Sequence, residues 1–335
     1  MGSTFVFAFN AIMPIILIVL LGYGLRRIKF IDLPFVNLLN KFVFRIGLPI
    51  LLFYNVYSIN SLKDIDWAVV LFAVVAILAV FSVGLIFVSI AIKDPKQKGV
   101  ILQSIFRSNF ALVGIPLAQT LGGIEALAIV SIISAFTIPL LNVLAVVSLT
   151  MFQRNEFGER ISVIKILKMI ASNPLILAVL LGLFVLVIRS FIPTVNGELV
   201  FSLKNNLTFS YTFLKVMSQI ASPLALIALG GQFEFSVVKK LAKQIIIGVT
   251  WRILIVPASV LTVAYMLAPR IPGISVSYPA LIALFATPVA VSSAIMTHEM
   301  GGDNQLAGQL VVWSTICSIV TIFFTIVVMR YIGAF

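Results

Sequence analysis

The sequence is poor in the side chains that carry most catalytic and metal chemistry. Its 335 residues include one cysteine, Cys317, and one histidine, His298. A single cysteine cannot form a disulfide within the chain, and one cysteine with one histidine cannot supply the usual ligand sets of zinc or iron–sulfur centres. The same scarcity leaves little room for Ser-His-Asp or Cys-His catalysis. We therefore expect no metal site, no cofactor and no enzymatic activity.

Charged residues are also scarce. They make up 10% of the chain, 61% of the residues are hydrophobic, and the mean hydropathy is +1.19, whereas soluble domains carry about 25% charged residues. This composition excludes a soluble enzyme, a disordered chain and a nucleic-acid-binding domain, and makes the lipid bilayer the natural solvent. The net charge of +12 does not indicate nucleic acid, because the positive residues lie in short clusters between apolar runs.

Ten apolar segments are long enough to cross a membrane as helices, since about 20 apolar residues suffice. They lie near residues 5–25, 35–57, 67–92, 99–121, 124–150, 163–188, 206–231, 241–267, 279–298 and 304–330. Of the 23 lysines and arginines, 17 then fall on one side of the membrane and six on the other. The richer side is the cytoplasmic one. We therefore predict a multi-pass protein of the cell (inner) membrane with its N-terminus and C-terminus outside.

The two halves of the chain resemble each other. Three ordered matches, each containing a proline, pair 14–22 with 174–182, 46–49 with 220–223, and 111–118 with 283–290. Each half holds five spans, and because five is odd the second half must enter the membrane from the opposite side. The sequence thus predicts an all-α membrane protein with a five-helix repeat at 1–150, a short cytoplasmic linker at 151–162 and an inverted five-helix repeat at 163–335.

The prolines of the third match, Pro116 and Pro288, predict that the fourth and ninth spans are broken helices that cross near the middle of the membrane. Proline removes a backbone hydrogen bond, and we expect each second half-helix to begin at or just after its proline. Such a helix start carries free N–H groups and about half a positive charge, so two of them facing one cavity make an anion site. The candidate substrate-binding residues are Asn109, Gly114, Ile115, Pro116, Leu117, Ala286, Thr287, Pro288, Val289 and Ser292.

Arginines inside the spans allow more than one interpretation. Arg107 lies within the fourth span, where it would either guide an anionic substrate from the cytoplasm or extend its side chain to the membrane surface. For Arg252, in the first half of the eighth span, we expect the surface arrangement. No span holds a central Asp or Glu. Coupling to a sodium ion held by unwound carbonyls, to a proton carried by the substrate, or to no ion at all therefore stays open.

Five segments carry a family resemblance: 10–15 (Asn-Ala-Ile-Met-Pro-Ile), 22–24 (Gly-Tyr-Gly, with basic residues behind it), 45–53, 107–117, and the ninth span with Gly302 and Asp303 leading into 313–318. The chain resembles the auxin efflux carrier family, within the superfamily of the bile acid:sodium symporters, over essentially its whole length. Its short connection at 151–162 is similar to that of compact bacterial members, some of which carry malate or malonate. The resemblance implies ten spans in two inverted repeats, crossed fourth and ninth helices at the substrate site, and a scaffold of spans 1, 2, 6 and 7. It also implies pairing through scaffold helices, and hence a homodimer.

The function that we expect is secondary active transport of a small organic anion by alternating access. The candidate substrates are carboxylates such as malate, malonate or an auxin-like acid. The alternative is an anion-selective channel whose pore is lined by the same helix ends. In either case the partners are the anion and the lipid bilayer, and not nucleic acid.

Overall fold

The computed structural model describes residues 2–58, 66–152, 164, 168, 171–195 and 198–334. The expected linker at 151–162 lies outside the described residues except for its first two positions. The elements in chain order are α1 (Gly2–Arg27), α2 (Leu33–Phe42), η1 (Val43–Gly47), α3 (Leu48–Tyr57), α4 (Trp67–Ala91), α5 (Pro95–Phe106), η2 (Phe110–Gly114), α6 (Ile115–Thr150), α8 (Pro174–Ser190), β1 (Thr194–Val195), β2 (Glu198–Leu199), α9 (Leu203–Asn206), α10 (Thr208–Gln232), η3 (Phe235–Val237), α11 (Val238–Thr250), η4 (Trp251–Ile255), α12 (Val256–Leu267), α13 (Pro272–Val276), α14 (Tyr278–Phe285), α15 (Val291–Glu299) and α16 (Asn304–Tyr331). Apart from the short antiparallel pair β1–β2, the described elements are helical.

Long apolar helices dominate the fold, as the composition predicts. Among the described residues, six helical stretches are long and apolar enough to cross a membrane: Leu33–Tyr57, Trp67–Ala91, Phe110–Thr150, Thr208–Gln232, Phe235–Leu267 and Asn304–Tyr331. Many large apolar side chains on these helices are exposed, including Leu71, Ile86 and Ile90 of α4. Such a surface suits lipid and not water. The chain is therefore a multi-pass membrane protein, whereas the count of ten spans stays a prediction.

The longest of these stretches, Phe110–Thr150, contains a break at a pair of glycines. A straight helix of its 41 residues would be roughly 60 Å long, about twice the thickness of a bilayer core. Gly122 and Gly123 have non-helical backbone angles, and Gly123 has φ of +65°, a conformation that glycine adopts without strain. The break coincides with the predicted boundary between the fourth and fifth spans.

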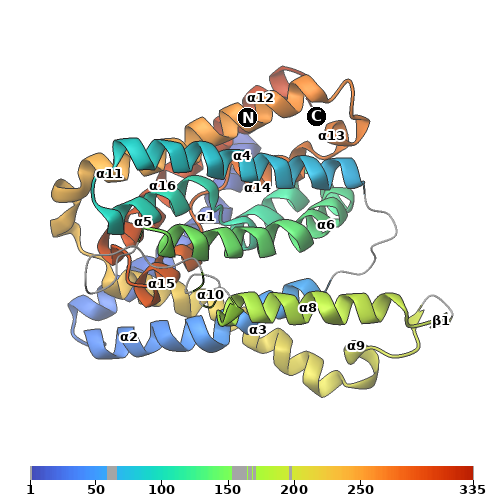
Figure 1. Cartoon of the computed structure of the whole chain (residues 1–335), viewed down its shortest axis with the longest axis horizontal. Helices are drawn as coiled ribbons and strands as arrows, with labels where there is room; N and C mark the ends of the chain where they lie inside the picture. Colours follow the sequence, from blue (N-terminus) through green and yellow to red (C-terminus); the bar gives the residue numbers. More distant parts are fainter. Residues whose placement is uncertain are drawn as a thin grey trace.

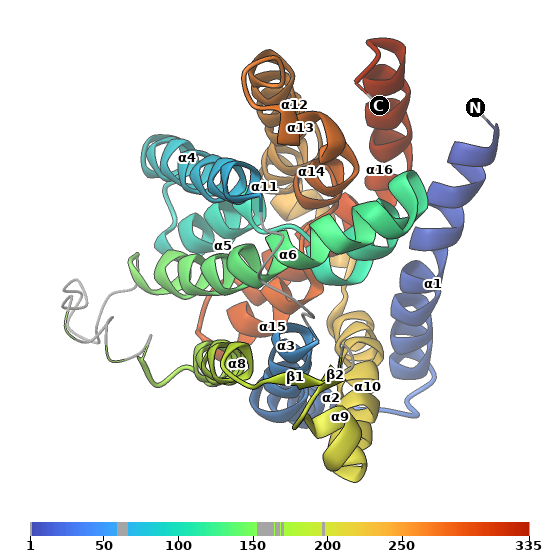
Figure 2. The same ribbon diagram turned by 90° about the vertical axis from the view of Figure 1, so that its right-hand side faces the viewer.

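The helices form two groups that lie side by side, and α1 runs along both, next to α10 and α16 (Figures 1 and 2). We call α1, α2, α3, α8 and α10 the scaffold group; within it α1 packs against α10 and α3 packs against α8. We call α4, α5, α6, α11, α12, α14, α15 and α16 the crossing group. Each scaffold pair joins a helix of the first half to one of the second, as a two-fold relation between the halves requires. The inverted repeat itself stays a prediction.

Glycines allow the closest approach in the scaffold group, between α1 and α10. A Cβ atom at Gly22 would lie 2.2 Å from the carbonyl oxygen of Ile227. One at Gly230 would lie 2.0 Å from the carbonyl oxygen of Val19. Both distances are far below van der Waals contact, so the two backbones pack this tightly only because neither position carries a side chain.

Three prolines follow π-helical turns instead of breaking their helices. Pro49, Pro116 and Pro257 each occupy the second position of a helix that continues directly from η1, η2 and η4. A proline has no N–H and clashes with the carbonyl four residues earlier, and a wider π turn accommodates both defects. The expectation that the fourth span breaks at Pro116 is therefore wrong, because the helix resumes at Phe110 and passes through this proline.

Candidate functional site

Two interrupted helices meet in the middle of the crossing group. α5 ends at Phe106 and η2 begins at Phe110, while α14 ends at Phe285 and α15 begins at Val291. The two interruptions, 107–109 and 286–290, run antiparallel and form an isolated β-bridge between Ser108 and Val289. Backbone groups released by the breaks thus find partners in each other, which a backbone surrounded by lipid and protein requires.

Backbone hydrogen bonds hold this crossing together. The N–H of Asn109 donates to the carbonyl of Pro288 at 2.7 Å, and the N–H of Ala290 donates to the carbonyl of Arg107 at 3.2 Å. The N–H of Val289 donates to Ser314 Oγ of α16 at 3.0 Å. The segments that the breaks unwind are therefore fixed in place.

Gly114 lets η2 lie directly against α14. A Cβ atom at this position would be 2.7 Å from the carbonyl oxygen of Ala283 and 2.7 Å from the Phe110 ring. A small residue is therefore required here for the two helices to cross.

Arg252 of η4 lies fully buried beside the crossing, and its hydrogen-bond partners among the described residues are all backbone carbonyls. Its guanidinium donates to Ile105 at the end of α5, and to Leu284, Phe285 and Thr287 at the end of α14. The expectation that Arg252 extends to the membrane surface is wrong. Four of its five N–H donors instead bind carbonyls that have no partner at a helix end.

Arg107 is also buried, with 4% of its surface exposed. One Nη donates to Asn142 Oδ1 of α6 at 2.7 Å, and the other donates to Met296 Sδ of α15. Among the described residues, no carboxylate forms an ion pair with Arg107. Of its two interpretations, the structure excludes the surface arrangement. A buried cation without an anionic partner is costly, so the site holds a positive charge that a bound anion would neutralise.

A cavity of about 70 Å³ lies between the crossing and the scaffold group. Arg107, Ser108 and Asn109 line it from the first interruption, and Asn142 lines it from α6. The scaffold side consists of mostly apolar or small residues: Leu48, Leu51, Leu52, Leu175, Ser222 and Ala225. Both helix groups therefore contribute to the same cavity.

Both helices that restart after the interruptions present their first residues to this cavity. Phe110, Ala111 and Leu112 begin η2, and Val291 and Ser292 begin α15. The first N–H groups of a helix have no partner within it and carry a partial positive charge. The lining residues that the structure describes include no Asp or Glu. The crossing side of the cavity is therefore lined by free N–H groups at two helix starts and by the Arg107 guanidinium.

Two buried polar atoms at the cavity lack a hydrogen-bond partner among the described residues. They are Asn109 Nδ2 and Ser108 Oγ, and both residues line the cavity. An unpaired amide group buried away from water costs free energy. An N–H donor left unused beside Arg107 is available to an oxygen of a bound molecule.

The sequence-predicted residues occupy three places around the crossing. Asn109 and Ser292 line the cavity. The remaining residues of the ninth span, Ala286, Thr287, Pro288 and Val289, form the buried second interruption. Those of the fourth span, Gly114, Ile115, Pro116 and Leu117, lie farther along η2 and α6 and are not among the cavity-lining residues. Their roles in binding stay predictions.

Sequence reasoning missed several cavity residues. The scaffold residues Leu48, Leu175 and Ser222 lie far from the interruptions in sequence and reach the cavity only through packing. Ser108 could have been found, because it stands in the polar run Arg107–Ser108–Asn109 within an otherwise apolar span.

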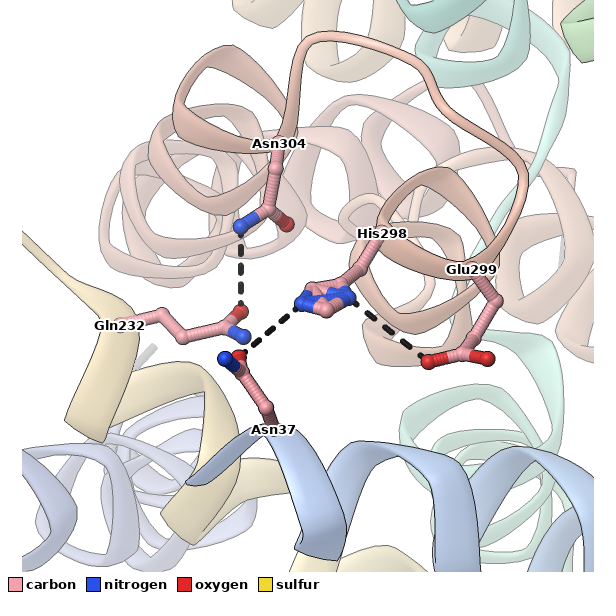
Figure 3. A network of polar contacts seen from close by, with 5 residues as sticks. All are labelled: Asn37, Gln232, His298, Glu299 and Asn304. Atoms are coloured by element: carbon pink, nitrogen blue, oxygen red, sulfur yellow. Dashed lines mark hydrogen bonds and ion pairs between the residues drawn. The ribbon is translucent and has the colours of Figure 1, made fainter. Parts of the chain in front are cut away.

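A second polar cluster joins the two helix groups at the ends of α10 and α15 (Figure 3). His298 Nε2 lies 3.1 Å from Asn37 Oδ1 of α2, and His298 Nδ1 lies 3.7 Å from Glu299 Oε1. Asn304 Nδ2 of α16 donates to Gln232 Oε1 of α10 at 3.4 Å. In the described part of the chain, no three His, Cys, Asp or Glu side chains gather as they would around a metal ion.

Comparison with known proteins gives a match to a family profile. The family profile described as Membrane transport protein matches residues 7–326. A comparison with curated proteins finds no match. Because the match covers nearly the whole chain, the protein belongs to the membrane transport protein family, which is the family of the auxin efflux carriers.

Proposed function

We propose that this protein is a secondary active transporter that exchanges a small organic anion across the membrane by alternating access. The observation that carries the proposal is the charge of the cavity: the buried Arg107, the unpaired amide of Asn109 and the starts of two helices face it, with no Asp or Glu among its described lining residues. Such an arrangement favours an anion. Membership of a membrane transport family supports the same class of function.

The positive groups at the cavity suit a dicarboxylate such as malate or malonate. Each helix start contributes about half a positive charge, and Arg107 contributes a full charge. A single carboxylate neutralises only part of this charge. The apolar scaffold wall of Leu48, Leu51 and Leu52 also accommodates the carbon chain of a monocarboxylate or an auxin-like acid. These acids are therefore compared in the experiment below.

The size of the cavity supports a mechanism in which the helix groups separate. Its volume of about 70 Å³ equals roughly that of a few water molecules. A dicarboxylate with its carbon chain needs more space, so the scaffold group must move away from the crossing to admit it. On one face this movement separates Asn37 from His298 and Gln232 from Asn304, whose contacts now join the groups (Figure 3).

The orientation that goes with this mechanism follows from the distribution of lysine and arginine. In a ten-span arrangement with both termini outside, the polar cluster around His298 lies at the cytoplasmic face. On this proposal, the contacts of that cluster hold the two helix groups together on the cytoplasmic side in the conformation described here. We propose that the protein resides in the cell (inner) membrane as a homodimer joined through scaffold helices.

Counterflow in proteoliposomes tests this function. Vesicles are loaded with unlabelled malate, malonate, a monocarboxylate or indole-3-acetate, and the uptake of the matching labelled acid is measured. The expected result is transient accumulation driven by a dicarboxylate inside, which saturates with external acid. Vesicles with the folded variant Arg107→Gln are the control and should accumulate less. Ohmic anion current without counterflow would favour the channel, and neither activity in folded protein would contradict the proposal.

A further inference from the structure

We infer that the guanidinium of Arg252 is a fixed cation that holds the two interrupted helices together, in the position where a coupling cation would otherwise bind. Exchange by this protein therefore needs no sodium. The part of the inference that concerns transport rests on the proposed function. The part that concerns Arg252 itself is testable without any substrate.

The geometry places Arg252 between the ends of two helices that stop at the crossing. Its Nη1 donates to the carbonyl of Ile105 at 3.1 Å, one residue before the end of α5. Its Nε donates to the carbonyl of Thr287 at 3.1 Å, and its Nη2 contacts those of Leu284 and Phe285, the last two residues of α14. One side chain thus connects α5 to α14 through four carbonyl oxygens.

These carbonyls are the acceptors that a broken helix leaves without partners. The last four carbonyls of any helix lack an intrahelical donor, and an unpaired buried carbonyl is costly. At the end of α14, the N–H of Ala286 donates to the carbonyl of Ile282, and the hydroxyl of Thr287 donates to the carbonyl of Ala283. Arg252 supplies donors to the two carbonyls that follow. The side chain therefore completes the hydrogen bonding of the break.

The charge of Arg252 matches that of the two helix ends. Each C-terminus carries about half a negative charge, so the ends of α5 and α14 together balance one guanidinium. Arg252 is fully buried and is not among the residues that line the cavity. Its charge is thus used at the helix ends, whereas that of Arg107 faces the cavity. The two buried arginines have different tasks.

The same groups hold coupling cations in transporters with discontinuous helices. In such proteins, unwound backbone carbonyls and the C-terminal ends of half-helices coordinate sodium. Here the carbonyls of Ile105, Phe285 and Thr287 already bind the guanidinium. A sodium ion would have to compete with a cation that is covalently attached to η4. The fixed cation thus removes the need for a mobile one, and Arg252 acts as a positioning residue.

The first test uses the unmodified protein. Counterflow of a dicarboxylate is measured in sodium, potassium and N-methylglucamine salts of equal ionic strength. The expected result is the same initial rate in all three. A rate that requires sodium would overturn the inference while leaving the proposed exchange intact. If no acid is exchanged in any salt, the proposed function fails, and the next test decides the inference without it.

The second test restores the missing cation chemically. In Arg252→Ala, methylguanidinium fits the vacated position. Tetramethylammonium is the control cation, because it has no N–H to donate. We expect methylguanidinium to raise the melting temperature of detergent-solubilised Arg252→Ala and to leave that of the wild type unchanged. Where exchange is measurable, it should fall about tenfold or more in the variant, because several charge-assisted hydrogen bonds are lost, and should recover with methylguanidinium.

Two further variants separate a positioning role from general stability. Arg252→Lys keeps the charge but cannot reach carbonyls of both helices with a planar fork, so it should retain partial exchange and show no response to methylguanidinium. Arg270→Ala removes an exposed arginine beyond α12 and should match the wild type in every assay. Equal stabilisation of all variants by methylguanidinium, or no response in Arg252→Ala, would overturn the inference. If Arg252→Ala does not fold, Arg252→Lys and the salt comparison still test it.

Discussion

Arg107→Gln separates binding from stability more clearly than any other substitution. The arginine is buried, its contacts are the neutral groups Asn142 Oδ1 and Met296 Sδ, and it lines the cavity. Glutamine retains an amide that can still donate to Asn142 but carries no charge. The substitution therefore removes the attraction for an anion and disturbs the packing little.

The magnitude follows from the charge-assisted bonds that a carboxylate would form with Arg107. Such a bond is worth about 1.5–3 kcal/mol, which corresponds to roughly a 10- to 150-fold loss of affinity. The stability of the unliganded protein should rise or stay the same, because a buried cation without an anionic partner costs desolvation energy that a buried glutamine does not. We thus expect weaker binding together with an equal or higher melting temperature.

Titration calorimetry of the purified protein with malate and malonate measures the affinity, and thermal unfolding without ligand measures the stability. Arg107→Lys is the matched control: it keeps the charge, loses the planar fork and should bind with intermediate affinity. Unchanged affinity in a folded Arg107→Gln would refute the reasoning. A large loss of stability with unchanged affinity would show that the charge serves the fold instead.

Three other changes test separate parts of the account. Gly230→Ala places a Cβ atom 2.0 Å from the carbonyl oxygen of Val19 and should lower the unfolding free energy by about 1–3 kcal/mol. The control Gly24→Ala adds a Cβ atom with no other atom within 4 Å and should leave the unfolding free energy unchanged, so equal melting temperatures of the two variants would contradict the tight α1–α10 packing. Pro288→Ala restores an N–H at the second interruption and should weaken acid binding roughly tenfold, because helix can re-form there. The control Pro14→Ala in α1 should leave the affinity for the acid unchanged, and titration calorimetry measures both affinities. In a Cys317→Ser background, a reversible thiol crosslinker that joins Asn37→Cys to His298→Cys should stop counterflow until reductant is added, because the two helix groups can no longer separate. Undiminished counterflow after complete crosslinking would contradict that movement.

The membrane class and several boundaries could be predicted from local sequence. Composition alone indicates a bilayer as the solvent, and the Gly122–Gly123 pair ends a span where the apolar run is interrupted. The position of the first interruption was harder to predict, because Pro116 is the obvious helix breaker. The actual break falls on the polar run Arg107–Ser108–Asn109, and the wider turn of η2 accommodates the proline.

The role of the buried Arg252 could not be predicted from sequence, and for Arg107 the sequence left two interpretations open. A hydropathy pattern gives depth in the membrane only approximately, so Arg252 in the first half of its span resembles an arginine whose side chain reaches the surface. Its partners are backbone carbonyls from α5 and α14, and backbone acceptors leave no pattern in side chains. The scaffold wall of the cavity, with Leu48 and Ser222, likewise depends on contacts between distant segments.

A structure determined with the exchanged acid bound tests the central claim most directly. The account predicts one carboxylate beside the guanidinium of Arg107 and the amide of Asn109, with its oxygens toward the first N–H groups of η2 and α15, and the scaffold group moved away to make room. Arg252 should keep its bonds to the carbonyls of Ile105 and Thr287 in that state. An acid bound away from the crossing, with Arg107 still enclosed as it is here, would contradict the account.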